Sequence, residues 1–336
     1  MKVVIATPLY PPEVGGPAAY AQAFVERFPA HGVEVALVKF SGVRRFPKFL
    51  KHLAYFFQVL RALRGADALI AFDTWSTGVP AILAAKLGGT KSFVRIGGDF
   101  LWETFVERTK KRIRLSEFYA LPRDFSVKEK MIRAGTRWIT TRADMLVFNT
   151  AWQRDLWAKE YGFKSDHARV IENAYPTERE VSPAREKVFV SAGRAHFLKN
   201  EETLASAFTE VKRRHPDIEL DTRSLPPQAH QARIRDAYAV VISSVSEVSP
   251  NTAIDALRYG KPFIAPLDTG ARERLGDAGI FVDTLDAGAL ATAMERLLDP
   301  EEYARACARV ATFSFSHSWD DVVTEFLTVI TKLCAS

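Results

Sequence analysis

The sequence is poor in the features that define several common protein classes. It has only two cysteines in 336 residues, Cys307 and Cys334, which lie far apart and outside any paired motif. This disfavours a disulfide framework and a zinc site, and we expect a reducing compartment. No apolar run is long enough to span a bilayer, and no basic segment followed by an apolar one marks a signal peptide after Met1. We therefore expect a cytoplasmic protein.

Motifs for nucleic-acid binding or for a nicotinamide cofactor are also missing. The sequence has no zinc-finger spacing, no ribonucleoprotein motif and no G-x-G-x-x-G pattern. Its 46 basic and 40 acidic residues give a net charge of +6, which favours anionic partners such as nucleotides or lipid headgroups. We expect no nucleic-acid partner.

What the sequence does contain is an alternation of short apolar runs with helical patterns. The runs with the character of buried strands include Lys2–Ala6, Val33–Phe40, Ala68–Phe72, Ser92–Ile96, Met145–Phe148 and Val188–Ala192. Such alternation is typical of doubly wound α/β sheets. A length of 336 residues suits two domains better than one.

One stretch, residues 239–266, shows this alternation most clearly. Ala239–Ile242 and Phe263–Ala265 have the length and composition of buried strands. The helix between them has both ends marked: we expect Ser249 to cap its start, with Pro250 as the first helical residue, and Gly260 to end it. The stretch therefore predicts two parallel strands joined by a crossover helix.

Two acids stand around the start of this helix. Glu247 follows the first strand, at the edge where open α/β sheets bind ligands, and Asp255 lies about one and a half turns into the helix. The free N–H groups of the helix start favour a phosphate, and two carboxylates suit the hydroxyls of ribose and sugars. The alternative is an exposed helix start whose acid merely suits the helix dipole.

Three further loops carry candidate ligand groups. Gly15 and Gly16 end a proline-rich loop before a helix, which lets the backbone approach a ligand. Asp99 follows a strand and two glycines, and Arg194 and Lys199 leave another strand just before a helix, where two cations favour an anion. Each has an ordinary alternative, because such residues also occur in plain turns and on solvated surfaces.

Residues 44–64 form a basic amphipathic segment. Its apolar residues recur at helical spacing: Phe49, Leu50, Leu53, Phe56, Phe57, Leu60 and Leu63. Basic residues surround them. The segment is either a helix packed on the sheet with solvated Lys and Arg, or a surface that docks on an anionic membrane. The two interpretations are compatible.

Taken together, these stretches resemble retaining glycosyltransferases of family 4. Glu247, seven intervening residues and Asp255 are similar to the E-x7-E signature, with Asp in place of the second Glu. Gly193, Arg194 and Lys199 match the G-R-L-x-x-x-K-G motif, although its Leu and final Gly are absent. YPPEVGGPAAY, RIGGDFLWE and FSFSHSW also resemble segments of the family, so the resemblance covers nearly the whole chain.

The resemblance implies a GT-B fold, with two Rossmann-like doubly wound domains facing across a cleft. We expect an acceptor-side domain over residues 1–175, a compact donor-side domain over 176–312, and a C-terminal helix within 313–336 that crosses back to the first domain. The implied activity is retaining, hexosyltransferase-like transfer from a nucleotide-diphosphate sugar. No D-x-D sequence is present, so we expect no metal and no cofactor.

The family also implies roles for the candidate residues. Asp255 would bind the ribose, Glu247 would orient the donor sugar or support the cation of the transition state, and Arg194 and Lys199 would clamp the diphosphate. Asp99 would help to position the sugar, and Trp102 and Glu103 would be further sugar or acceptor contacts. The remaining donor contacts would come from the loops at the starts of two helices: Gly15, Gly16, Ser249, Asn251 and Thr252.

Substrates and pathway stay open at this stage. We expect a UDP- or GDP-linked sugar, a sugar or lipid-linked acceptor, and a role in bacterial surface polysaccharide or glycolipid assembly, with peripheral attachment to the inner face of the membrane through residues 44–64. Residues 219–238 leave room for about one strand and one short helix, which makes base recognition uncertain. The alternatives are a GT-B sugar-nucleotide epimerase or hydrolase, and a non-catalytic sugar-nucleotide-binding protein.

Overall fold

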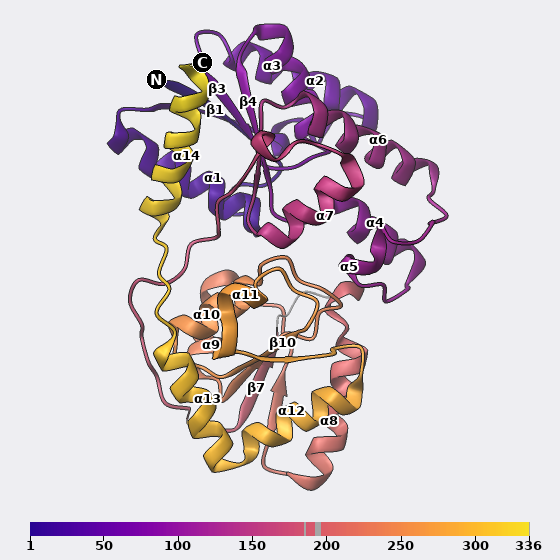
Figure 1. Cartoon of the computed structure of the whole chain (residues 1–336), viewed down its shortest axis with the longest axis vertical. Helices are drawn as coiled ribbons and strands as arrows, with labels where there is room; N and C mark the ends of the chain where they lie inside the picture. Colours follow the sequence, from indigo (N-terminus) through magenta and orange to yellow (C-terminus); the bar gives the residue numbers. More distant parts are fainter. Residues whose placement is uncertain (185, 192–195, 336) are drawn as a thin grey trace. The chain divides into compact units, whose positions relative to one another are not determined.

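The chain folds into two units, each built on a parallel β-sheet (Figure 1). The computed structural model describes residues 1–184, 186–191 and 196–335. Unit 1 consists of residues 1–101, 123–174 and 318–336, and unit 2 consists of residues 102–122 and 175–317. The domain boundaries expected after residues 175 and 312 stay predictions.

The sheet of unit 1 has the strand order β2-β1-β3-β4-β5-β6, and every pairing is parallel. Its first five strands are the apolar runs expected from the sequence, with ends shifted by at most one residue, and β6 completes the sheet: β1 (Lys2–Thr7), β2 (Glu34–Lys39), β3 (Ala68–Ala71), β4 (Lys91–Ile96), β5 (Met145–Phe148) and β6 (Ala168–Val170). The order reverses between β1 and β3. In open α/β sheets such a switch point opens a crevice at the carboxyl ends of the strands.

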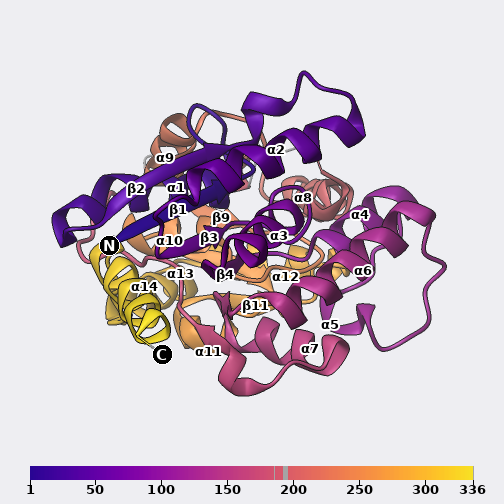
Figure 2. The same cartoon turned by 90° about the horizontal axis from the view of Figure 1, so that it is seen from above.

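Helices cover both faces of this sheet. They are α1 (Gly16–Arg27), α2 (Lys48–Ala62), α3 (Gly78–Gly88), the start of α4 (Phe100–Thr109), α6 (Val127–Arg142), α7 (Ala151–Tyr161) and α14 (Trp319–Cys334), with 3-10 turns at Phe28–His31, Phe40–Val43 and Ser165–His167. On one face, Phe24 of α1 and Phe326 of α14 pack edge to face with ring centroids 4.8 Å apart. The last helix of the chain thereby completes the core of unit 1. α2 and α3 lie side by side (Figure 2).

The sheet of unit 2 has the order β11-β10-β9-β7-β8, again all parallel. Its strands are β7 (Val188–Ser191), β8 (Glu219–Asp221), β9 (Ala239–Val241), β10 (Phe263–Pro266) and β11 (Ile280–Val282). Counted from β7, this is the same 2-1-3-4-5 order as in unit 1, with the reversal between β7 and β9. Both units are thus doubly wound, and each has its own switch point.

Helices also cover both faces of the second sheet. They are α5 (Leu115–Phe118), α8 (Glu201–Arg214), α9 (Pro227–Asp236), α10 (Asn251–Arg258), α11 (Arg272–Leu275), α12 (Ala287–Leu298) and α13 (Pro300–Thr312), with 3-10 turns at Phe197–Lys199 and Gly276–Ala278. Leu204 of α8 and Met294 of α12 are buried in the core on one face, and Ile254 and Leu257 of α10 in the core on the other. The expected single strand and short helix of residues 219–238 are β8 and α9.

α2 confirms the amphipathic helix expected in residues 44–64, but the face that packs differs from the expected stripe. Tyr55, Val59 and Leu63 are buried, and the Tyr55 hydroxyl donates to the carbonyl oxygen of Val38 at 2.9 Å. Leu50, Leu53 and Phe57 instead remain 53%, 53% and 57% exposed. The expected stripe combined the buried Leu63 with these exposed residues and omitted Tyr55 and Val59, so it merged two faces of the helix. Among the described residues, no helix is long and apolar enough to cross a membrane.

Candidate functional site

The loops that leave β7 and β9 meet beside the switch point of unit 2. Lys199 lies in the loop after β7, and its Nζ contacts Glu247 Oε1 in the loop after β9 at 2.6 Å. Ser244 joins the same cluster, because its hydroxyl donates to Glu247 Oε1 at 2.6 Å and lies 3.3 Å from Lys199 Nζ. Two residues expected at the donor site are therefore brought into direct contact at the carboxyl edge of the sheet.

The backbone around Lys199 is held from several sides. Ser243 Oγ donates to the carbonyl oxygen of Lys199 at 2.7 Å, and the Val245 N–H donates to that of Leu198 at 2.9 Å. These bonds tie the Lys199 loop to the loop that follows β9. The position of the Lys199 amine relative to Glu247 is thus set by the fold and not by the lysine side chain alone.

Asn200 explains one departure from the family motif. It replaces the final Gly of that motif and has φ 53° and ψ 41°, the left-handed conformation that favours Gly and tolerates Asn. Its buried side chain donates from Nδ2 to the Thr284 carbonyl at 2.6 Å and accepts at Oδ1 from Thr203 Oγ1 at 2.8 Å. Asn200 is the N-cap residue of α8, but its side chain makes no capping hydrogen bond and serves these contacts instead.

Glu247 is fixed by a second loop of unit 2. Its N–H donates to the carbonyl oxygen of Asp268 at 3.1 Å, and its own carbonyl oxygen accepts from the Gly270 N–H at 3.0 Å. Both partners belong to the loop that follows β10. The carboxylate of Glu247 is therefore carried on backbone that two neighbouring loops hold in place.

α10 follows the Glu247 loop, as the sequence predicted, but it begins one residue later than expected. Pro250 is the N-cap: its carbonyl oxygen accepts from the N–H groups of Ala253 and Ile254, so Ser249 is not the cap. At the other end Gly260 has φ 65°, which confirms the expected left-handed residue after the helix. Three of the expected donor residues thus lie at the helix start, with Asn251 exposed and Ser249 and Thr252 half-buried.

Asp255 lies on α10 and contacts α9. Its Oδ1 accepts from Gln231 Nε2 at 3.2 Å. Burial raises the pKa of the Asp255 carboxyl to about 6, against the opposing effects of the nearby Arg258 charge and the Gln231 bond. The second acid of the E-x7-E pattern is therefore a partly desolvated carboxyl that is held by the short region between β8 and β9.

An arm formed by residues 102–122 packs on unit 2 beside these loops. Arg112 Nε donates to Asn200 Oδ1 at 2.6 Å, and the Leu115 N–H donates to Ser246 Oγ at 2.9 Å. Arg114 pairs with Asp283 at 2.6 Å. The arm thus contacts the residue after Lys199 and the residue before Glu247, although it comes from the first half of the chain.

The candidate residues of unit 1 lie on two different loops. Gly15 is the N-cap of α1 and Gly16 its first residue, at the switch point between β1 and β3. A Cβ atom on Gly15 would lie 2.8 Å from Leu9 Cδ1, so a larger residue there would require the Leu9 side chain to shift. Asp99 follows β4, but its side chain is only 1% exposed and accepts from Trp157 Nε1 at 2.9 Å. Asp99 is therefore buried in this conformation, and its contact with a sugar stays a prediction.

Two expectations stay predictions: the complete diphosphate clamp, and a site without metal or cofactor. Gly193 and Arg194 lie outside the described residues, so the expected diphosphate clamp is represented here by Lys199. In residues 1–184, 186–191 and 196–335, no group of three or more His, Cys, Asp or Glu side chains is arranged to hold a metal ion. The metal-free and cofactor-free site stays a prediction.

Sequence reasoning missed several residues that shape this site. Ser244 carried a weak signal, because it follows a buried strand in a polar run next to Glu247. Gln231 and Arg112 carried none, since their contacts with Asp255 and Asn200 join segments 24 and 88 positions apart in the sequence. Only the fold brings such residues together.

Comparison with known families agrees with the geometry. The model of the glycosyl transferase 4-like domain matches residues 2–174, and the model of glycosyl transferases group 1 matches residues 222–300. No curated protein sequence matches the chain.

Solved structures share the fold along the whole chain. Sucrose-phosphate synthase from Thermosynechococcus elongatus is similar with a TM-score of 0.74 at 16% identity, covering 99% of both chains. HepE from Anabaena in complex with UDP-glucose has a TM-score of 0.73 at 14% identity, covering 99% of this chain and 100% of that one. A UDP-N-acetylglucosamine 2-epimerase has a TM-score of 0.61 at 12% identity, covering 99% and 97%. With its doubly wound units and both family matches, the chain belongs to the group 1 glycosyltransferases and has the GT-B fold.

Proposed function

We propose that the protein is a retaining, metal-independent glycosyltransferase that moves a hexosyl group from a nucleotide-diphosphate sugar to an acceptor. The observation that carries the proposal is the Lys199–Glu247 pair at the switch point of unit 2, directly before α10. UDP is the nucleotide we favour over GDP, because HepE, which has the same fold, was solved with UDP-glucose. No nucleic acid or cofactor is part of this activity.

Lys199 and Glu247 would change partners when the donor binds. In the structure the Lys199 amine contacts the Glu247 carboxylate. The diphosphate would draw the amine toward itself, and Arg194 would join it there; their positive charge would stabilise the departing nucleotide in the way a metal does elsewhere. Glu247 would then orient the donor sugar or support the cation that develops at its anomeric carbon.

The other candidate residues would hold the ends of the donor. Asp255 would accept from the ribose hydroxyls, while the α10 start at Ser249, Asn251 and Thr252 would supply backbone donors to the phosphates. The loop with Gly15 and Gly16 would approach the phosphates, and Asp99 would help to position the sugar. These assignments rest on the motif positions and on the loops that carry them.

The test compares Lys199→Gln with Lys86→Gln. Both lysines pair with one acid, Lys199 with Glu247 at 2.6 Å and Lys86 with Asp144 at 2.7 Å, but Lys86 lies in α3 of unit 1. We expect Lys199→Gln to lower UDP release from UDP-glucose by about 100-fold in the presence of acceptor, and Lys86→Gln to change it little. Activity of Lys199→Gln within a few-fold of the parent would remove Lys199 from the site. NMR of the product's anomeric proton tests retention.

Two alternatives predict different requirements for turnover. An epimerase or hydrolase of the same fold would act on the sugar nucleotide without an acceptor, and the similarity to the UDP-N-acetylglucosamine 2-epimerase keeps this alternative in view. A non-catalytic sugar-nucleotide-binding protein would be stabilised by UDP, by about 2.7 kcal/mol at a hundred times the dissociation constant, without any turnover. Assays of UDP-glucose with and without acceptor separate the three.

The exposed face of α2 supports a membrane-proximal acceptor. Leu50, Leu53 and Phe57 lie exposed at helical spacing, and Arg61 and Arg64 continue the same line, both exposed. Apolar side chains flanked by basic ones suit an anionic lipid surface. We therefore favour a lipid-linked acceptor and a role in bacterial surface polysaccharide or glycolipid assembly, with peripheral attachment on the cytoplasmic face.

A further inference from the structure

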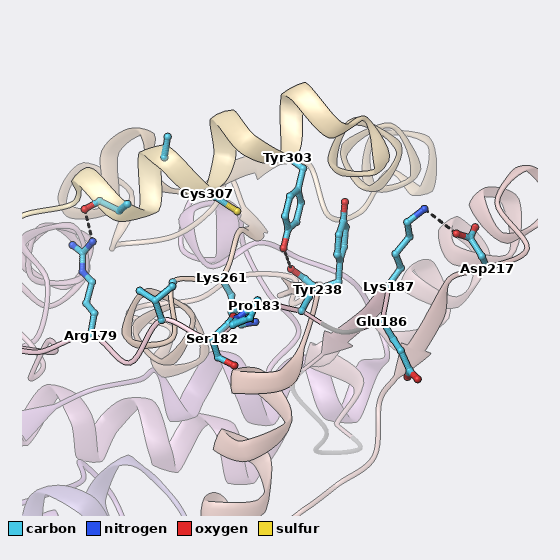
Figure 3. A pocket seen from close by; sticks show the side chains of 15 residues that line it. Arg179, Ser182, Pro183, Glu186, Lys187, Asp217, Tyr238, Lys261, Tyr303 and Cys307 are labelled. Atoms are coloured by element: carbon cyan, nitrogen blue, oxygen red, sulfur yellow. Dashed lines mark hydrogen bonds and ion pairs between the residues drawn. The ribbon is translucent and has the colours of Figure 1, made fainter.

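A cavity of about 750 Å³ lies in unit 2, away from the loops of the donor site (Figure 3). Its lining includes Lys187, Tyr238 and Lys261, which come just before β7, β9 and β10, respectively. The loops that carry Lys199 and Glu247 leave the opposite, carboxyl ends of β7 and β9. The volume is within the range of roughly 300–1,000 Å³ that ligand pockets have.

The walls of the cavity are mainly apolar. The segment before β7 contributes Val181 and Pro183, and α13 contributes Ala308. The rings of Tyr238 and Tyr303 stack with centroids 4.1 Å apart, and Figure 3 shows them nearly parallel. Their hydroxyls are already used, since Tyr303 donates to the Tyr238 carbonyl at 3.1 Å and Tyr238 to the Leu297 carbonyl at 2.5 Å. These surfaces offer apolar contact.

Among the described charged residues that line the cavity, Lys261 is the one that is buried. Lys261 is 1% exposed, and its Nζ donates to the carbonyl oxygen of Ser182 at 2.6 Å. Among the described residues no carboxylate lies within ion-pair distance of this amine. Burial lowers the pKa of Lys261, while the charge of Asp236 opposes that shift. An ammonium group has three donors, so two of them are available to an anion.

The other cations of the cavity are already paired. Lys187 contacts Asp217 at 2.8 Å, and Arg179 Nη1 donates to the carbonyl oxygen of Val310 at 2.8 Å. A buried positive charge without a negative partner is costly unless something compensates it. Lys261 is therefore the group in this cavity whose chemistry calls for an anion.

We propose that the cavity binds an amphiphilic organic anion, with its carboxylate or phosphate at Lys261 and its apolar part between the Val181–Pro183 segment and α13. This site is separate from the donor site and does not depend on the proposed transfer reaction. Because Lys261 donates to the Ser182 carbonyl, the ligand would also affect the segment that precedes β7.

Calorimetric titration with phenyl phosphate tests the proposal, with benzoate as the carboxylate probe and inorganic phosphate as the anion without an apolar part. We expect one phenyl phosphate per chain, and at least about tenfold weaker binding of inorganic phosphate. Lys261→Met should weaken phenyl phosphate binding by about tenfold or more, because it keeps the length of the side chain and removes its charge. Lys187→Met, which alters a lysine already paired with Asp217, should change it by less than about twofold.

A second variant keeps the test independent of how Lys261→Met folds. Ala308→Trp leaves Lys261 in place and fills the cavity from α13, so it should abolish phenyl phosphate binding. No binding of phenyl phosphate to the parent protein, or unchanged binding to Lys261→Met, overturns the proposal. Displacement of phenyl phosphate by UDP overturns it as well, because it places the probe in the donor site. UDP binding is titrated separately, so failure at either site is distinguished from failure at the other.

Discussion

Asp255 makes protein stability depend on pH through a single carboxyl group, and in the proposed function the same group would bind the donor ribose. Its pKa is raised from 3.8 to about 6, mainly by burial. An acid with a raised pKa in the folded state makes the protein less stable as the pH rises, because folding then has to bury a charge. The loss begins above the unfolded pKa near 4 and is complete once the pH is well above 6.

We predict that Asp255→Asn stabilises the ligand-free protein at about pH 8 and has no stabilising effect at about pH 4. A shift of this size corresponds to an upper limit of roughly 3 kcal/mol. Thermal unfolding at both pH values measures the effect, with Asp155→Asn, an exposed acid of α7, as the control. The same variant should bind UDP more weakly, since the amide cannot accept from both ribose hydroxyls as a carboxylate does. A gain in stability that is equal at both pH values would contradict the role of the Asp255 charge.

Asn200 supplies the second prediction at this scale. Its left-handed backbone disfavours residues with a Cβ atom, and Asn tolerates that conformation better than Ala. Asn200→Gly suits the left-handed backbone but loses the side-chain contacts with Arg112 and Thr284. Asn200→Ala loses the same contacts and also disfavours the backbone conformation. We expect Asn200→Ala to lower the free energy of unfolding by about 1 kcal/mol more than Asn200→Gly. Arg112→Met isolates the contribution of the arm. Equal unfolding temperatures for the Gly and Ala variants would show that the backbone conformation is not limiting.

At the scale of elements, the sequence predicted best where local signals agree. The β9-α10-β10 unit was expected from two apolar runs, a polar loop, and Gly260 at the helix end, and the structure contains it. The start of α10 was misjudged by one residue because Ser249 and Pro250 both suit a helix start. The local sequence does not decide which of these two residues is the N-cap of the helix.

The packing of elements was less predictable than their existence. In α2 the apolar residues occupy two faces, and the sequence does not say which one the sheet covers; Tyr55, with its polar hydroxyl, turned out to be buried. The arm of residues 102–122 gave no signal at all that it would pack on unit 2. Its contacts depend on Arg112, Arg114 and Leu115 meeting loops that lie far away in the sequence. Such pairings follow from the assembled fold, so periodicity within a segment cannot reveal them.

At the scale of the whole molecule, the shared strand order of the two sheets explains why the motif residues gather. The order β11-β10-β9-β7-β8 makes β7 and β9 neighbours, so Lys199 and Glu247 meet although they are 48 positions apart. The strands themselves were expected from apolar runs, but their order was not predicted. Asp99 shows the limit of that resemblance, since its motif position was matched while its side chain is buried against Trp157.

The surface charge of the chain and the exposed face of α2 lead to the last prediction. A net charge of +6 draws the protein toward anionic surfaces, and each basic residue near such a surface contributes about 1 kcal/mol. Leu50, Leu53 and Phe57 would then enter the headgroup region. We expect binding to vesicles of phosphatidylcholine with phosphatidylglycerol, weakened by salt, and little binding to phosphatidylcholine alone.

The double variant Leu53→Glu with Phe57→Glu separates the apolar face from the net charge. The matched control is Val127→Glu with Met131→Glu, which places the same two charges on exposed apolar positions of α6. Vesicle co-sedimentation should be about tenfold weaker for the α2 variant and close to that of the parent for the α6 variant. If the two variants lose binding equally, net charge alone attracts the protein, and α2 is not the docking surface. If neither variant loses binding, another surface binds the membrane, and the exposed stripe of α2 is not the docking surface.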